Sequence, residues 1–317
     1  MTGASAPDDG FRHEAVFYRG ASEYRSAVLP FLLEGLARAE PVLVAVPGPA
    51  AQVVRAGLDG QSADVTFADM TELGRNPARV IPTIWDFAQS HRGRPVRFVA
   101  ELAWPGRSAP ELHEAVAHEA MINLAFRGTA VAVLCPYDVG RLDPETVASA
   151  ARTHPVIRTR DDVRPSDGYA AADVLREAAT PLPDPPDDAE RMGYTADLRS
   201  VRMFVADLAR KAGLTEDRTA DLVLAVGEVA ANTVRHTGDA GVALVWHTQA
   251  EVICQVSDAG RIDDPLAGLR RPSGPSGFGL WVVHQLCDLV ELRSGPGGTT
   301  IRMHVRLPGE AGADGPG

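Results

Sequence analysis

A stretch rich in proline and aspartate interrupts the chain between residues 158 and 192. Within it, the run ATPLPDPPDD holds four prolines. Because proline fixes φ and lacks a backbone N–H, such a run continues neither a helix nor a central strand. The 317 residues also exceed one ordinary domain. The sequence therefore predicts two domains, residues 11–157 and 193–308, joined by a linker at 158–192 that contains a short helix, and a disordered tail at 309–317.

The composition argues against several classes of protein. A net charge of −11 is unfavourable for a nucleic-acid-binding protein, which needs a basic face to replace phosphate counterions. Lys211 is the only lysine of the chain, and no GxxxxG precedes it. This excludes a Walker A loop and argues against a Schiff-base enzyme.

Cysteine usage and hydropathy lead us to expect a cytoplasmic protein. Cys135, Cys254 and Cys287 are widely spaced and form no CxxC pair, so neither a zinc ribbon nor a disulfide framework is expected. The first residues lack the apolar core of a signal peptide. No uninterrupted apolar stretch approaches the roughly 18 residues of a membrane span.

Short apolar runs alternate with helical patterns in the first segment. This alternation predicts an α/β domain with a mostly parallel sheet covered on both faces. Ligands of such sheets bind where the strands end. Strands are expected at 41–47, 64–70, 95–102 and 129–138, and helices at 22–39, 49–58, 78–91, 109–126 and 143–152.

The second segment begins with helical patterns and ends with strands. Apolar residues at three- and four-residue spacing predict a first helix that ends before Gly213, and Thr215 can cap a second helix that runs to about His236. Two strands, a loop rich in glycine at 261–277, a further helix at 279–287 and a final hairpin follow. This order predicts an α+β sandwich with an antiparallel sheet.

Glu228, Asn232 and His236 are spaced four residues apart on the second helix of this segment, so they share one helical face. An asparagine oxygen is a hard ligand that suits Mg²⁺, and a glutamate can accept a hydroxyl proton. Taken alone, the same pattern also describes a solvated helix face.

Three further pieces follow along the chain. Asp258 ends an apolar strand, and its carboxylate could accept a hydrogen bond from an exocyclic amine, with Gly260 close to a flat ring. Glycines in GPSGFG precede a helix whose free N–H groups could hold phosphate. Thr299 and Thr300 open the last strand. Each piece alone is an ordinary turn or strand; the combination in this order is far more specific.

The combination resembles the Bergerat-type (GHKL) ATP-binding domain and, within it, the anti-sigma factor/serine-protein kinase family. The stretch VGEVAANTVRHTG resembles that family's N box, VSDAG its G1 box and GPSGFGLWVV its G2 box. The resemblance covers about residues 193–308. A histidine kinase is less consistent with the sequence, because residues 158–197 contain no histidine that could accept the phosphoryl group.

The resemblance implies specific roles. Asn232 would ligate Mg²⁺, Glu228 would be the catalytic base, and Asp258 would bind the adenine amine of ATP. Gly277 and Gly279 would hold the phosphates under a lid at roughly 261–276. The remaining ATP-binding candidates are Arg235, His236, Gly260, Phe278, Leu280, Thr299 and Thr300.

The resemblance also implies an activity and partners. The protein would be an ATP-dependent serine/threonine kinase that phosphorylates a STAS-type anti-anti-sigma protein and thereby controls a sigma factor. A homodimer through the C-terminal domain is implied as well. The alternative is a non-catalytic switch that holds ATP and sequesters a sigma factor or another partner.

The first segment resembles the methanogen/methylotroph sensory (MEDS) domain over about residues 11–157. The resemblance rests on HEAVFYRGASEYRSAVLPFLLEGLARAEPVLVAVP, HEAMINLAF and LCPYDVGRLDPETVASAARTHP. It implies a RecA-like α/β fold that senses an unidentified small molecule. A metal site of His, Cys and Glu stays open, beside the plainer interpretation of Cys135 as a small core residue. The candidate pocket residues are His13, Tyr18, Glu101, Glu119, Cys135, Tyr137 and His154.

Overall fold

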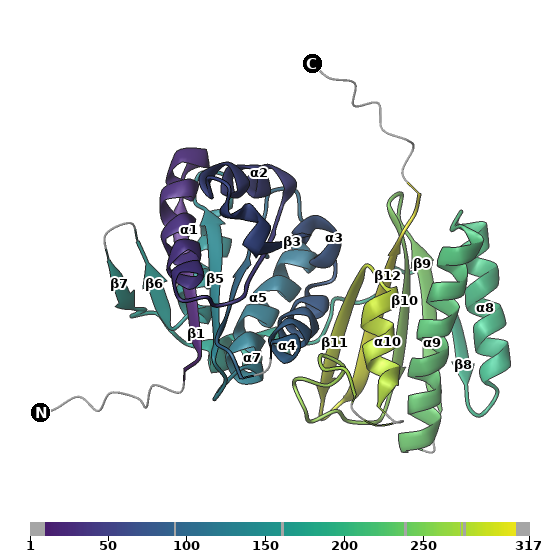
Figure 1. The fold of residues 1–317 in the computed structure, drawn as a ribbon. Coiled ribbons are helices and arrows are strands. Elements are labelled where there is room, and N and C mark those ends of the chain that lie inside the picture. The colour runs from purple at the N-terminus through teal and green to yellow at the C-terminus, as the bar shows by residue number, and fades with distance from the viewer. Residues whose placement is uncertain are drawn as a thin grey trace, which may run out of the picture. The chain divides into compact units, whose positions relative to one another are not determined.

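The structure, a computed structural model, describes residues 10–91, 93–159, 162–237, 240–272, 274 and 277–308. The predicted tail at 309–317 and residues 273, 275 and 276 of the predicted lid lie outside the described residues. The chain forms two compact units, which we call the N-terminal unit and the C-terminal unit, with the boundary after Ala178 (Figure 1).

The N-terminal unit is built on a mostly parallel sheet with the strand order β3-β2-β4-β5-β1-β6-β7, in which only the β6–β7 pair is antiparallel among the described strands. This confirms the predicted fold class. The strands are β1 (Arg12–Tyr18), β2 (Val42–Val46), β3 (Val65–Asp69), β4 (Val96–Ala100), β5 (Val131–Asp138), β6 (Val156–Arg158) and β7 (Val163–Pro165).

Helices cover both faces of this sheet (Figure 1). Helix α1 packs on β1, β2, β4 and β5, and α2 packs beside α1. Helix α5 lies on the opposite face, where it contacts α4, α6 and α7. The helical segments are α1 (Gly20–Ala37), α2 (Gly48–Gly57), η1 (Gln61–Asp64), α3 (Met70–Leu73), η2 (Pro77–Arg79), α4 (Val80–Ser90), α5 (Ala109–Ala125), α6 (Pro144–Thr153) and α7 (Ala171–Ala178).

A capping box fixes the start of α5. The backbone N–H of Glu111 donates to the side chain of Ser108, and the Glu111 carboxylate accepts from the backbone N–H of Ser108 at 2.7 Å. Two N–H groups that the helix leaves unpaired are thereby satisfied. Glu119 and Asn123 lie further along this helix and are buried.

The predicted linker contains the expected short helix, α7, and also the strand β7 and the start of β8, which were not expected. Helix α7 packs on α5 through Ala171 and Val174, which contact Ala120. Residues 179–189, which include the proline run, form no helix or strand. This run lies on the sheet of the C-terminal unit, because the carbonyl of Pro183 accepts a hydrogen bond from Arg302 at 2.6 Å.

The C-terminal unit is an antiparallel sheet with the order β11-β12-β10-β9-β8 and helices α8, α9 and α10 packed on it, as predicted for an α+β sandwich (Figure 1). Helix α9 lies between α8 and α10. The elements are β8 (Glu190–Tyr194), α8 (Leu198–Lys211), α9 (Glu216–Thr237), β9 (Gly241–His247), β10 (Glu251–Asp258), α10 (Phe278–Leu286), β11 (Leu289–Gly295) and β12 (Gly298–Arg306).

The junction of α8 and α9 has the predicted geometry. Gly213 adopts a φ of +95° after the last turn of α8, and the N–H of Leu214 donates to the carbonyl of Ala209. This is a Schellman motif, in which glycine has no side chain to clash. Thr215 then accepts from the N–H of Arg218 and caps α9.

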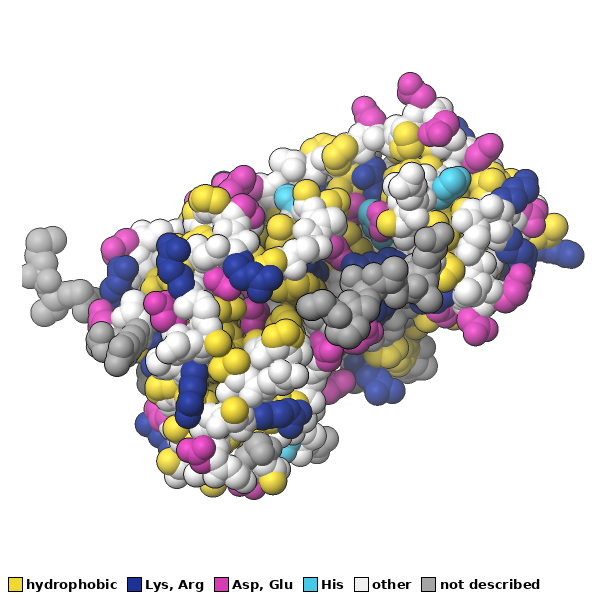
Figure 2. Space-filling model, turned by 90° about the horizontal axis from the view of Figure 1, so that it is seen from above, with side chains coloured by type: hydrophobic (Ala, Val, Ile, Leu, Met, Phe, Trp, Pro, Cys, Tyr) yellow, Lys and Arg dark blue, Asp and Glu magenta, His cyan; other side chains and the backbone are white. Residues whose placement is uncertain are grey.

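Two further observations concern the surface and the helices. On the face shown in Figure 2, basic side chains alternate with acidic ones and gather in no single basic field among the described residues. Among the helices that the structure describes, none combines the length and the low charge content needed to cross a lipid bilayer.

The turn between β11 and β12 generates a stability prediction. Gly298 has a φ of +110°, and a Cβ at this position would lie 2.2 Å from the carbonyl oxygen of Asp258. We expect Gly298→Ala to destabilise the C-terminal unit by at least about 2 kcal/mol. Gly297→Ala is the matched control, because nothing lies within 4 Å of its Cβ position. Scanning calorimetry measures both; equal unfolding temperatures for the two variants would contradict the prediction.

Candidate functional site

Glu228 and Asn232 lie on the face of α9 that meets the start of α10. A Cβ on Gly279 would lie 3.0 Å from Asn232 Nδ2 and 3.2 Å from Glu228 Oε2. Only a glycine therefore fits at this position without displacing one of these two side chains. The structure thus brings together the ExxxN pattern and the glycine-rich loop, which the sequence separates by about 50 residues.

Asp258, at the end of β10, is held by hydrogen bonds on both carboxylate oxygens. Oδ1 accepts from the N–H of Gly260 at 2.7 Å, and Oδ2 accepts from Thr233 Oγ1 at 2.6 Å. The hydroxyl of Tyr194 in turn donates to Thr233 Oγ1 at 3.0 Å. Strands β8 and β10 and helix α9 thereby fix one carboxylate.

Our sequence analysis missed Thr233 and Tyr194. Thr233 carries a signal that could have found it, since a hydroxyl that faces the core from the middle of a helix needs a partner. Tyr194 had no such signal, because β8 lies at the end of the predicted linker.

A pocket of about 290 Å³ opens beside Asp258. Apolar side chains such as Val229, Leu280 and Ile301 form its walls, and Asp258 provides a carboxylate. This volume is at the lower end of the roughly 300–1,000 Å³ of small-molecule pockets. It suits one flat ring system better than a whole nucleotide. The ATP-binding candidates that line it are Asn232, His236, Asp258, Gly260, Leu280 and Thr299.

Thr299 and Thr300 face opposite sides of the sheet. Thr299 lies opposite Asp258 in the β10–β12 ladder, and its hydroxyl donates to the carbonyl of Gly260 at 2.9 Å. Thr300 pairs with Ser257, and the two hydroxyl oxygens are 3.1 Å apart. Because side chains alternate along a strand, Thr300 points away from the pocket. The structure does not support Thr300 as an ATP contact.

The other candidates of this unit lie around the start of α10 and the end of α9. Arg235 Nη1 donates to Asn232 Oδ1 at 3.1 Å, so the predicted Mg²⁺ ligand has a protein partner in this state. Gly277, with a φ of +90°, is the N-cap of α10. Phe278 packs edge-on against Trp281, and neither Gly277 nor Phe278 lines the pocket.

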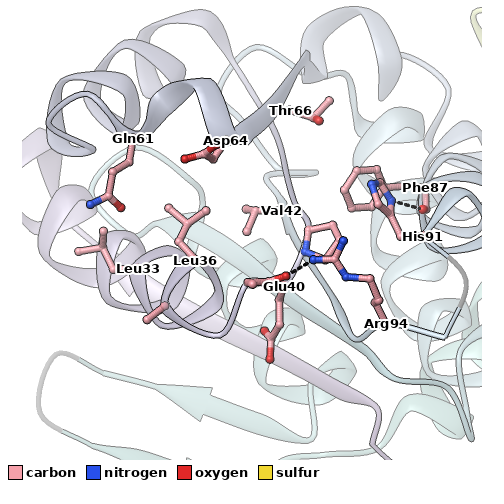
Figure 3. A pocket seen from close by; sticks show the side chains of 13 residues that line it. Leu33, Leu36, Glu40, Val42, Gln61, Asp64, Thr66, Phe87, His91 and Arg94 are labelled. Carbon is pink, nitrogen blue, oxygen red and sulfur yellow. Dashed lines mark hydrogen bonds between the residues drawn. The ribbon is translucent and has the colours of Figure 1, made fainter.

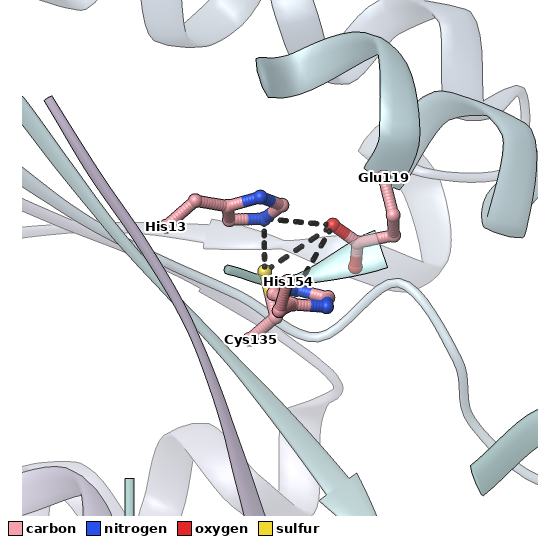
Figure 4. A group of neighbouring side chains, drawn as sticks. All are labelled: His13, Glu119, Cys135 and His154. Atoms are coloured by element: carbon pink, nitrogen blue, oxygen red, sulfur yellow. Dashed lines mark hydrogen bonds and ion pairs between the residues drawn. The ribbon is translucent and has the colours of Figure 1, made fainter. Parts of the chain in front are cut away.

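Four of the candidates in the N-terminal unit converge between the sheet and α5 (Figure 4). His13 Nε2 and Cys135 Sγ lie 3.1 and 3.4 Å from Glu119 Oε2, and His154 Nε2 lies 3.5 Å from the same oxygen. All four side chains are buried. A fifth candidate, Tyr137, donates to the other carboxylate oxygen at 3.1 Å.

Burial and mutual contact set the charges of this cluster. Burial lowers the pKa of His13 to about 4, and the neighbouring His154 ring adds to this effect. Burial alone would raise the pKa of Glu119, but His154 and His13 outweigh it and hold it well below its usual range. Burial and the Glu119 carboxylate raise the pKa of the Cys135 thiol. Burial therefore disfavours the charged forms of His13 and of the Cys135 thiol, whereas the two histidines favour the charged Glu119 carboxylate.

Tyr18 and Glu101 form a separate pair on the α1 side of the sheet. The Tyr18 hydroxyl donates to Glu101 Oε1 at 2.9 Å, whereas Glu101 Oε2 and the hydroxyl of Tyr24 are buried without a hydrogen-bond partner among the described residues. Tyr18 and His13 are five residues apart on β1 and so point to opposite faces. The predicted sensory residues therefore do not line one pocket.

A larger cavity of about 730 Å³ lies at the other edge of this sheet, where the strands begin (Figure 3). It lies among the end of α1, the start of β2 and the end of α4. Arg94 donates to the carbonyl of Ala39 across it, and Asp64 and His91 also line it. Sequence reasoning directed attention to the carboxyl ends of the strands and named no residue of this cavity.

Glu101 generates a prediction of pH dependence. Burial raises the pKa of Glu101 from 4.5 to about 7. Between these values the folded chain keeps a proton that the unfolded chain releases, so this group's contribution to stability falls as the pH rises from about 4.5 to 7. Glu101→Gln removes the titration. Relative to the wild type, the variant should gain about 3 kcal/mol of unfolding free energy between pH 4.5 and 8. Denaturant titrations at both pH values measure this gain, and a constant difference between the proteins would contradict the assignment.

Comparisons with known proteins agree with this division into two units. Residues 12–155 match the MEDS family, described as the methanogen/methylotroph, DcmR sensory domain, and residues 194–305 match the histidine kinase-like ATPase domain. No curated protein matches the chain. A crystal structure of the RsbU and RsbW domains of a Mycobacterium tuberculosis protein is 20% identical, with a TM-score of 0.28; the match covers 64% of this chain and 49%, about half, of the other. The chain therefore combines a MEDS domain with a histidine kinase-like ATPase domain.

Proposed function

We propose that the C-terminal unit binds ATP with Mg²⁺ and transfers the γ-phosphoryl group to a serine or threonine of a protein partner. The observation that carries the proposal is the convergence of Glu228, Asn232 and Gly279 beside the pocket of Asp258, within a histidine kinase-like ATPase domain. The pocket of Asp258 suits the adenine ring, and the region beside Glu228, Asn232 and Gly279 suits the phosphates.

The pocket of Asp258 fits the adenine. Each carboxylate oxygen accepts one hydrogen bond from the protein and has a lone pair left for an exocyclic amine. Thr233 and Gly260 hold the carboxylate in place, so little reorganisation is needed when the ring enters. The apolar walls then pack on the faces of the ring.

The start of α10 fits the phosphates. Its first-turn N–H groups have no partner within the helix and favour anions. Asn232 Oδ1 would hold Mg²⁺, which neutralises phosphate charge when bound. Glu228, one turn away on the same helix, is placed to accept the proton of the acceptor hydroxyl. Arg235 donates to the same oxygen, which has a second lone pair for the ion.

The partner in this proposal is a STAS-type anti-anti-sigma protein. Its phosphorylation state would decide whether the C-terminal unit binds it or a sigma factor, and the MEDS domain would adjust this choice in response to its small-molecule ligand. A switch that binds ATP and sequesters the sigma factor without phosphoryl transfer uses the same pocket, and the second experiment below distinguishes the two.

The first prediction concerns ATP binding. Asp258→Asn replaces the carboxylate with an amide, whose NH₂ group can face the exocyclic amine of adenine instead of accepting from it. We expect the affinity for ATP to fall about 10- to 100-fold. Isothermal calorimetry with Mg²⁺ measures this loss. Thr300→Val is the matched control, because Thr300 lies on the other side of the sheet. If wild type binds no ATP, or Thr300→Val weakens binding as much as Asp258→Asn, the proposed pocket is wrong.

The second prediction separates binding from catalysis. Glu228→Gln keeps the shape of the side chain but cannot accept a proton, so we expect phosphoryl transfer to fall about 10²- to 10⁴-fold. ATP affinity should stay within about threefold, since the adenine end is untouched. Radiolabel transfer to the partner and calorimetry measure the two quantities. Transfer at the wild-type rate in the variant would rule out Glu228 as the base. ATP binding by the wild type without any transfer would favour the switch.

A further inference from the structure

The N-terminal unit holds a cluster of metal-ligating side chains that the proposed kinase reaction does not use. His13, Glu119, Cys135 and His154 each offer one ligand atom, and these atoms all lie within 4.8 Å of one another (Figure 4). We propose that these four side chains form a tetrahedral site for Zn²⁺ or a similar borderline divalent transition metal. This inference does not depend on the ATP site.

The spacing of the ligand atoms fits such an ion. Zn–N and Zn–O bonds of about 2.0–2.1 Å and a Zn–S bond of about 2.3 Å place the ligands of a tetrahedron roughly 3.3–3.6 Å apart. Glu119 Oε2 lies 3.1 Å from His13 Nε2 and 3.4 Å from Cys135 Sγ. Sγ lies 3.5 Å from His13 Nε2, and His154 Nε2 is 3.5 Å from Oε2. Four of the six ligand pairs therefore lie close to the spacing of a tetrahedral site, and the other two lie within 4.8 Å.

The outer hydrogen bonds orient both histidines toward the centre. Nδ1 of His154 lies 2.9 Å from the carbonyl oxygen of Ala150, which can only accept, so this nitrogen carries the proton. Nδ1 of His13 lies 3.2 Å from Oδ1 of Asn123. Both Nε2 atoms are thereby left to face the cluster with their lone pairs. Histidine ligands of metals are typically held in this way by a second partner.

The orientation of Asn123 is itself fixed. Its Nδ2 donates to backbone carbonyls, including that of Thr153 at 2.8 Å. A flipped amide would point its oxygen at these carbonyls, so Oδ1 has to face His13. Because Asn123 on α5 presents its oxygen to His13, His13 carries its proton on Nδ1.

A proton on one histidine would satisfy fewer polar atoms of this cluster than a metal ion would. An imidazolium at His13 would satisfy one contact to Glu119. His154 Nε2 would still be buried without a hydrogen-bond partner among the described residues, and it faces the same oxygen. One divalent cation satisfies both Nε2 lone pairs, the carboxylate and the sulfur together. Cys135 would bind as the thiolate and release its proton to solvent.

The site is closed, which defines its role. His13 and His154 have no exposed surface, and Glu119 and Cys135 are buried as well. With four protein ligands, no position is left for a substrate water, as in structural zinc sites. The ion would join β1, β5, α5 and the end of α6, elements that lie far apart in the sequence. We therefore expect metal binding to raise the thermal stability of the N-terminal unit.

The test uses the full chain and Co²⁺ as a spectroscopic probe for the zinc site. A tetrahedral Co²⁺ ion with a cysteine ligand gives intense d–d bands and a thiolate-to-metal charge-transfer band. We expect one Co²⁺ per chain, displaced by an equivalent of Zn²⁺, and a higher unfolding temperature with either ion. The double variant Cys254→Ser/Cys287→Ser keeps Cys135 as its only thiol and should keep the charge-transfer band.

Two variants then assign the ligands. Cys135→Ser should lose the charge-transfer band, and His154→Gln should weaken metal binding at least about 100-fold. Tyr137→Phe is the control, because it removes a hydroxyl that contacts Glu119 without removing a ligand. If the wild-type chain binds no Co²⁺ or Zn²⁺ stoichiometrically, the cluster is only a buried histidine–carboxylate pair and the proposal fails. A charge-transfer band that persists in Cys135→Ser would overturn it as well. Metal binding by the wild-type chain needs no variant. A variant that fails to fold therefore does not prevent the test.

Discussion

A carboxylate buried in a protein must have partners, and Glu119 imposes this requirement on the N-terminal unit. Taking an ion out of water costs several kcal/mol unless other groups pair with it. Its partners are His13 on β1, Cys135 on β5 and His154 after α6, together with Tyr137. The parallel pairing of β1 with β5 places His13 and Cys135 on neighbouring strands, where both contact Glu119 of α5. The polar cluster therefore depends on the same packing of strands and helices that forms the fold.

Asp258 has a similar position in the C-terminal unit, but its partners leave it accessible. Thr233 and the N–H of Gly260 each satisfy one oxygen, and the pocket keeps the remaining lone pairs open. Glu119 is enclosed by side chains that can themselves ligate, whereas Asp258 faces a cavity with apolar walls. Because of this difference, we propose a closed metal site in the N-terminal unit and an adenine-binding pocket in the C-terminal unit.

The sequence predicts what depends on local periodicity and misses what depends on pairing across the fold. Most of the predicted helices and strands exist, because their apolar spacing is local. Strand β1 was not predicted, because His13 and Glu14 interrupt its apolar run; both are buried and paired with distant residues. The choice between Thr299 and Thr300 depends on the register of β12 against β10, which no single-strand pattern contains. For the same reason, one list of sensory candidates falls into two groups on opposite faces of a sheet.

The start of α10 lies close to Glu228 and Asn232, where we propose that the phosphates bind. Gly279 permits this approach, since any larger residue would meet both side chains. The pocket volume of about 290 Å³ suits the adenine ring alone. Asn232 Oδ1 accepts from Arg235 and has a second lone pair for the Mg²⁺ of the proposed reaction. A kinase and an ATP-dependent switch would both bind ATP in this place. What separates the two functions is then the chemistry at Glu228 and not the shape of the pocket.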